Sequence, residues 1–147
     1  MRENKDSHGP VENVASIDLR CGFNAPAAPN TLSVAAGDQL GFRVEPSVQH
    51  PGPTSVYLAK VPSGQTAKTF DGAGAVWFKI YEQGATFPGG KISWASDGAT
   101  ALHFTIPKNT PSGEYLARIE HIGLHSAAQT NGAQFYLSCA QVCCDAR

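Results

Sequence analysis

The sequence predicts an all-β protein, an immunoglobulin-like (fibronectin-type) β-sandwich with loop-rich connections. Apolar and polar residues alternate nearly everywhere along the chain, and short turn signals separate the alternating runs. Composition agrees, because charged residues make up 16% of the chain, against roughly 25% in an ordinary soluble domain. The 15 glycines and 10 prolines among 147 residues favour turns over helices. This length suits one domain with one core.

Alternation predicts each strand in turn. The runs lie at 32–34, 40–44, 55–61, 75–84, 101–107, 113–124 and 133–141. Turn signals such as "HPGP", "DGAG", "FPGG" and "NTPSG" divide them. Two late runs have well-defined apolar faces, which we expect to form core: Leu102, Phe104, Ile106, Tyr115, Ala117 and Ile119. Arg118 and Glu120 then lie on the opposite face. We expect no long helix, internal repeat or second domain.

Charge and hydropathy exclude several partners. The formal net charge is -1 and no basic run exists, so a nucleic acid or an anionic membrane is not expected as a partner. No apolar run reaches the roughly 18 residues that a membrane-spanning helix needs. The first residues, "MRENKDSHGPVENV", lack the apolar segment of a secretory signal.

Catalytic motifs of common enzymes are weak in this sequence. "HIGLH" has two histidines four residues apart, but it lacks the glutamate of a zinc-protease helix and lies in a strand pattern. The carboxylates are scattered over turns and an outward face, which is not the pair that glycoside hydrolysis requires. His103 and His121 receive no role: we expect His103 to be exposed and favour a structural place for His121.

The last strand brings polar side chains together. Gln134 and Tyr136 are two residues apart, so in a strand they project from the same face. Taken alone, Tyr136 is more typical of a core or interface aromatic than of a ligand. His50 lies in a turn stiffened by Pro51 and Pro53, which suits a plain turn residue and also a rigidly mounted metal ligand. Periodicity leaves both interpretations open.

Three segments resemble a known family. They are "HPGPTSVYLAKVPSGQTAKTFDGAGAVWFKIYEQG", "PSGEYLARIEHIGLHSAAQTNGAQFYLSCAQ" and "HGPVENVASIDLRC". Together they look like the fungal lytic polysaccharide monooxygenases of auxiliary activity family nine, formerly glycoside hydrolase family sixty-one. The resemblance runs from about residue 7 to residue 142, and its most specific motifs are H-x-G-P, the segment 123–127 and G-A-Q-F-Y-x-x-C.

This resemblance implies a copper enzyme. Its histidine brace would use His50 as a ligand, with Tyr136 as the axial ligand. His125 and Gln134 correspond to the pair that hydrogen-bonds the oxygen species, and Cys21 would be bridged to Cys139. The implied reaction is oxidation of β-1,4-glucan, cellulose above all, at C1 or C4, with O2 or H2O2 as co-substrate. The electron donor would be cellobiose dehydrogenase or a small reductant, and the protein would be a secreted monomer.

The sequence also departs from the family. Residue 1 is Met, whereas the family begins with a ligand histidine, and the "HGPVENV" segment resembles an internal stretch. We therefore expect residues 1–142 to be a catalytic domain without the family's first strand, and 143–147 to be a divergent tail. His8 in "HGP" is interpreted as a turn position rather than a processed terminus. Copper binding and activity should be impaired, and the alternative function is a non-catalytic carbohydrate-binding or accessory sandwich.

Overall fold

The structure is a computed structural model, and it describes residues 1–146. Strands and two 3-10 helices make up the regular elements of these residues. The strands are β1 (Leu32–Ala35), β2 (Gln39–Arg43), β3 (Thr54–Lys60), β4 (Trp77–Gln83), β5 (Ala85–Thr86), β6 (Ser93–Trp94), β7 (Ala101–Thr105), β8 (Gly113–Gly123) and β9 (Gln134–Asp145). The 3-10 helices are η1 (Ile17–Leu19) and η2 (Pro88–Gly90). Each of the seven predicted runs overlaps a strand.

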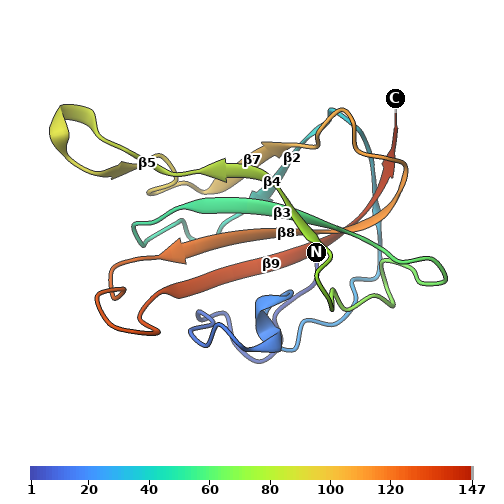
Figure 1. The fold of residues 1–147 in the computed structure, drawn as a ribbon, viewed down its shortest axis with the longest axis horizontal. Coiled ribbons are helices and arrows are strands. Elements are labelled where there is room, and N and C mark those ends of the chain that lie inside the picture. Colours follow the sequence, from blue (N-terminus) through green and yellow to red (C-terminus); the bar gives the residue numbers. More distant parts are fainter. Residues whose placement is uncertain (147) are drawn as a thin grey trace.

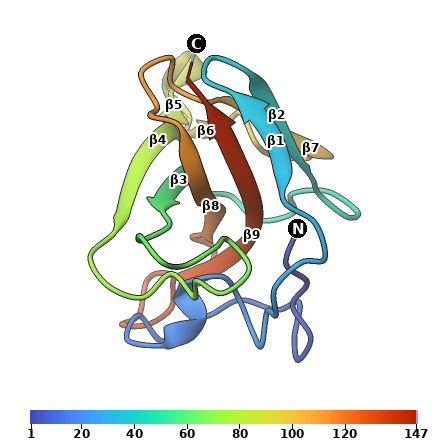
Figure 2. The ribbon, with the colours of Figure 1, turned by 90° about the vertical axis from the view of Figure 1, so that its right-hand side faces the viewer.

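Two sheets pack face to face and confirm the predicted β-sandwich (Figures 1 and 2). The larger sheet has the order β1-β9-β8-β3-β4, and β2 pairs with β7 in the smaller one. The β8–β9 pairing is the longest ladder, running from Gly113 opposite Cys144 to Gly123 opposite Gln134. Its length carries side chains from the centre of the sandwich to one end of the molecule.

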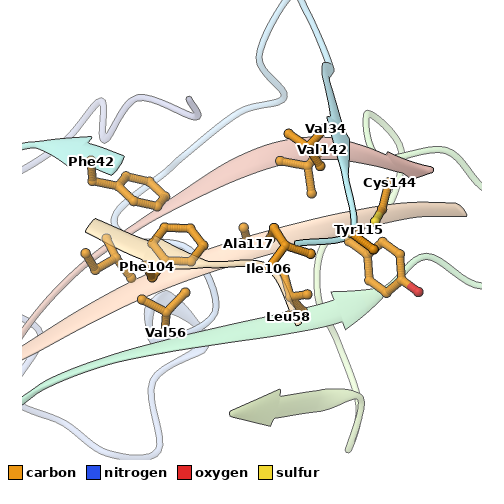
Figure 3. Close-up of a cluster of buried hydrophobic side chains, with 12 residues drawn as sticks. Val34, Phe42, Val56, Leu58, Phe104, Ile106, Tyr115, Ala117, Val142 and Cys144 are labelled. Carbon is orange, nitrogen blue, oxygen red and sulfur yellow. The ribbon is translucent and has the colours of Figure 1, made fainter. Parts of the chain in front are cut away.

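The core lies between the two sheets, as the alternating runs predict (Figure 3). The smaller sheet contributes Phe42 and Phe104, whose rings stack with centroids 6.0 Å apart. The larger sheet contributes the side chains on one face of β3 and β8. The expected core residues of β8 are all buried in this cluster: Tyr115, Ala117 and Ile119. Burying a large apolar side chain such as that of Ile119 contributes about 1.5–3 kcal/mol.

The outer face of the larger sheet holds the predicted polar residues of β8. The Arg118 guanidinium lies over the rings of Tyr57 and Trp77, at 4.7 and 4.3 Å from their centroids. On the same side, Cys21 and Cys139 form a disulfide, which confirms the pairing implied by the family resemblance. This bridge ties the N-terminal segment to β9.

Strand β9 extends further than the sequence suggests. Residues 143–145, expected to be a divergent tail, continue β9 and pair with β1 in parallel, with Ser33 opposite Cys143. Cys143 and Cys144 are both free thiols, and Cys144 is buried in the core. Among the residues that the structure describes, no helix is long and apolar enough to cross a membrane.

Candidate metal and oxygen site

A proline-flanked turn carries His50 to the end of the sandwich. The Ile122 N–H donates to the Pro53 carbonyl at 3.0 Å, and the Leu124 N–H donates to the Pro51 carbonyl at 2.8 Å. These bonds attach the turn to the end of β8. Gly52 is required here because a Cβ at this position would lie 1.7 Å from the Ile122 carbonyl oxygen.

Three ring side chains meet at this end. The imidazoles of His50 and His125 stack with centroids 4.0 Å apart and planes inclined by 21°. The His50 and Tyr136 ring centroids are 5.5 Å apart. The turn, the loop after β8 and the start of β9 each supply one of these side chains, so residues distant in sequence form one cluster. His125 is exposed, while His50 and Tyr136 are half-buried.

Gln134 lies beside Tyr136, as their spacing predicts. The Tyr136 hydroxyl donates to Gln134 Oε1 at 2.9 Å. Gln134 Nε2 in turn donates to Glu12 Oε1 at 3.0 Å. Burial raises the pKa of the Tyr136 phenol, and the nearby Glu12 carboxylate raises it further. The phenol is therefore neutral at ordinary pH and acts as a hydrogen-bond donor.

Two residues that the sequence did not assign to this region help to build it. Glu12 fixes the Gln134 amide, and no local pattern links these residues because they are 122 positions apart. His121 is buried beneath the turn: its Nε2 lies 2.9 Å from the His50 carbonyl oxygen and its Nδ1 lies 3.1 Å from Thr54 Oγ1. This confirms a structural place for His121, whereas His103 is exposed on β7 as expected.

The hydrogen bonds of His121 define the tautomer of its imidazole ring. The carbonyl can only accept, so Nε2 carries the proton and Nδ1 accepts from the Thr54 hydroxyl. Burial lowers the pKa of His121, and the charge of His50 acts in the same direction, although the bond to the His50 carbonyl opposes the shift. A neutral imidazole thus holds the turn that presents His50.

A groove of about 630 Å³ opens beside the cluster, and His8, His50, His121 and Tyr136 are among the residues that line it. Imidazole nitrogen with a weaker oxygen ligand is a donor set that suits Cu(II). His50 and Tyr136 supply one donor of each kind. Within residues 1–146, however, no three His, Cys, Asp or Glu side chains gather closely enough to hold a metal ion by themselves.

The fold and the ring cluster together define the class of protein: a two-layer β-sandwich with imidazole and phenol side chains gathered at one end. The family model for Auxiliary Activity family 9 (formerly GH61) matches residues 1–145. The chain therefore belongs to this family.

Known relatives agree with this assignment. The chain is 56% identical over 142 residues to "AA9 family lytic polysaccharide monooxygenase H" of Malbranchea cinnamomea, covering 95% of this chain and 61% of that protein. It is 52% identical over 138 residues to "AA9 family lytic polysaccharide monooxygenase C" of Emericella nidulans, covering 92% and 59%. This chain thus spans about three fifths of the length of these curated relatives.

A solved structure gives the same fold. "CvAA9A" superposes with a TM-score of 0.82 at 31% identity, covering 97% of this chain and 68% of that one. The shared architecture is a β-sandwich, which confirms the predicted fold class.

Proposed function

We propose that this chain is the larger part of a copper-dependent monooxygenase domain that cleaves β-1,4-glucan, with cellulose as the principal substrate. The observation that carries the proposal is the convergence of His50, His125 and Tyr136 at one end of the sandwich. Family membership supports oxidative cleavage of polysaccharide. Residues 1–142 contain every side chain that the proposal uses.

Copper fits the donors that the chain provides. His50 would bind it through an imidazole nitrogen and Tyr136 through the phenol oxygen. When bound, copper supplies the one-electron chemistry that activates O2 or H2O2 for oxidation at C1 or C4 of a glucosyl unit. The protein's contribution is to orient these donors, and the His121 bond to the His50 carbonyl fixes the backbone of the ligand turn.

His125 and Gln134 have separate tasks in this proposal. The exposed His125 ring lies against His50, so its imidazole could donate a hydrogen bond, or transfer a proton, to an oxygen co-substrate beside His50. The Gln134 amide accepts from the Tyr136 hydroxyl and donates to Glu12, which orients the phenol. We propose that both residues hydrogen-bond the oxygen co-substrate, that His125 also handles the proton, and that Gln134 also positions the phenol.

The donor set of this chain predicts weak copper binding. One imidazole and one phenol leave the metal short of the nitrogen ligands that Cu(II) prefers, so we expect affinity in the micromolar range or weaker. Calorimetric titration with Cu(II) tests this directly. A one-to-one site of nanomolar affinity would show that another group completes the coordination, and His8, which lines the same groove, is the first residue to replace.

The proposed partners follow from the proposed chemistry. The substrate is an insoluble β-1,4-glucan, and electrons come from an external donor, either cellobiose dehydrogenase or a small reductant such as a phenol. The Cys21–Cys139 disulfide favours an oxidising compartment and supports secretion. We propose that the protein works as a monomer.

An alternative function is a non-catalytic carbohydrate-binding or accessory sandwich. The specific observation in its favour is the absence, over the described chain, of a three-residue metal cluster. Incubation with cellulose, Cu(II) and ascorbate separates the two functions. Oxidised cello-oligosaccharides support the enzyme, whereas retention on cellulose without such products supports the binding module.

A further inference from the structure

A short antiparallel contact sets Glu12 directly opposite Gln134. The N-terminal segment runs beside the start of β9 (Figure 1), where Val11 and Phe135 exchange both backbone hydrogen bonds at 2.9 Å. In an antiparallel pairing, the next two residues along face each other without backbone bonds, and their side chains lie especially close. Val11 is 4% exposed, so this anchor is buried and holds Glu12 in place beside Gln134.

Three polar side chains form a hydrogen-bond chain that runs in one direction. The Tyr136 hydroxyl donates to Gln134 Oε1 at 2.9 Å, and Gln134 Nε2 donates to Glu12 Oε1 at 3.0 Å. The Glu12 side chain is exposed, and an ionised carboxylate can only accept hydrogen bonds. The amide nitrogen of Gln134 must therefore face Glu12, which leaves the amide oxygen for Tyr136.

The orientation of the Gln134 amide decides what the phenol offers to a metal ion. With the amide oxygen toward it, Tyr136 donates its only proton to Gln134 and keeps the lone pairs of its own oxygen. With the amide reversed, Nε2 would donate to the phenol oxygen and occupy a lone pair, and the hydroxyl proton would turn outward. A metal ion binds to a lone pair and is repelled by a proton, so the first orientation suits copper and the second does not.

The negative charge of Glu12 makes this selection strong. A hydrogen bond to an ionised acceptor is roughly twice as strong as one between neutral groups. A neutral amide at position 12 would both donate and accept, so it would fit either orientation of Gln134. Shape does not distinguish the two orientations, because the oxygen and nitrogen ends of an amide are nearly alike. The charge at position 12 is therefore the property that selects one of them.

We propose that Glu12 is a positioning residue for the copper site, because it selects the orientation of the Gln134 amide that leaves the Tyr136 oxygen able to bind metal. The inference rests on the proposed function and adds to it a residue outside the set of ligands. The bond to Glu12 uses one of the two protons on the Gln134 nitrogen, and the other remains for the oxygen co-substrate. Glu12 thus acts as an outer hydrogen-bond partner that orients groups nearer the metal.

Glu12→Gln tests the charge, because glutamine keeps the size and shape of the side chain but is no longer purely an acceptor. We expect turnover on cellulose to fall about 10–100-fold, as for the loss of other outer partners, while the thermal unfolding midpoint stays unchanged. Glu3→Gln is the matched control. Glu3 is an exposed carboxylate of the same N-terminal segment and pairs with Lys5, so its replacement should leave turnover unchanged.

A measurement without copper reports on the amide itself. In the nuclear magnetic resonance spectrum of an isotope-labelled chain, the side-chain amide signals of Gln134 are those that Gln134→Ala removes. We expect one of its two protons to exchange slowly with water in the unmodified chain, and about tenfold faster in Glu12→Gln, since a bond to a charged acceptor is lost. If Glu12 only filled space between the segments, glutamine would leave this exchange rate unchanged.

The outcomes separate the role of Glu12 from the proposed function. If the unmodified chain oxidises cellulose and Glu12→Gln matches it in turnover, the inference is wrong and the function stands, whatever the amide exchange rate. If the chain neither binds Cu(II) nor forms oxidised products, yet Glu12→Gln speeds the amide exchange of Gln134, the function is wrong and Glu12 still orients the amide. Loss of turnover together with faster exchange supports both.

Discussion

The imidazoles of His50 and His125 stack at a centroid distance of 4.0 Å, although the residues belong to different loops. Gly123 makes this contact possible. A Cβ there would lie 3.3 Å from the Cβ of His50 and equally close to ring atoms of His125. The two histidines therefore share one small space, yet they differ in exposure, and this difference predicts different roles.

Replacement of each histidine should separate metal binding from proton handling. We expect His50→Ala to lower Cu(II) affinity by more than about a hundredfold, beyond the 10–100-fold that loss of an outer partner costs. His125→Ala should change affinity by less than about tenfold, yet lower turnover by about 10²–10⁴-fold. Copper titration and product analysis measure both quantities. His103→Ala, at an exposed histidine on β7, is the control. Equal loss of Cu(II) affinity in His50→Ala and His125→Ala would contradict the separate roles assigned to the two histidines.

Strands with long alternating runs could be predicted from the sequence. When one face of a strand is buried, apolar residues recur at every second position, and this pattern is visible in the sequence. Tyr115, Ala117 and Ile119 illustrate this, since all three lie in the core cluster. It also predicted that Gln134 and Tyr136 share a face, and their side chains are hydrogen-bonded. These features depend on residues close together in the sequence, so the alternation of apolar and polar residues predicts them.

Features set by distant pairing could not be predicted. Strand β9 continues to Asp145 because β1 pairs with its last residues. The local sequence "VCCD" does not identify β1 as the pairing strand. Strands β5 and β6 have two residues each, too short for a periodic signal, and "FPGG" indicated only a turn. The links from Glu12 to Gln134 and from His121 to the His50 carbonyl join sites 122 and 71 positions apart.

Gly52→Ala should disturb the turn that carries His50. Its Cβ would overlap the Ile122 carbonyl oxygen, so the turn must shift away from β8. We expect a loss of about 1–3 kcal/mol in the free energy of unfolding, as for other overpacked sites. Copper affinity should fall as well, because His50 moves with the turn. Gly84→Ala is the control, since its Cβ meets no atom within 4 Å. A Gly52→Ala variant that matches it in stability and copper binding would refute the tight contact.

The Cys21–Cys139 disulfide should supply a large part of the stability. It joins residues 118 positions apart, and closing a loop of this size is worth about 4–5 kcal/mol on the chain-entropy estimate. The double variant Cys21→Ala/Cys139→Ala should therefore unfold at a much lower denaturant concentration. Cys143→Ser, at a half-buried free thiol, serves as the control and should change stability by less than about 1 kcal/mol. Coincident denaturation curves for the double variant and the unmodified chain would exclude a stabilising bridge.

Glu120 should make the protein less stable as the pH rises. Burial raises the pKa of its carboxyl group, and the nearby Arg118 and Lys79 oppose this shift without cancelling it. A pKa above the unfolded value of about 4.3 means that folding favours the protonated acid. This contribution to stability is complete below the unfolded pKa and is lost as the pH rises through the folded pKa.

Glu120→Gln tests this assignment because glutamine mimics the neutral acid. The variant should match the unmodified chain near pH 4 and exceed its thermal midpoint by about 2–4 °C at pH 7. Glu45→Gln, whose carboxylate pairs with Arg43 in solvent, is the control and should change the midpoint equally little at both pH values. If Glu120→Gln instead lowers the midpoint at pH 7, attraction to Arg118 and Lys79 outweighs burial, and the direction of the pKa shift is wrong.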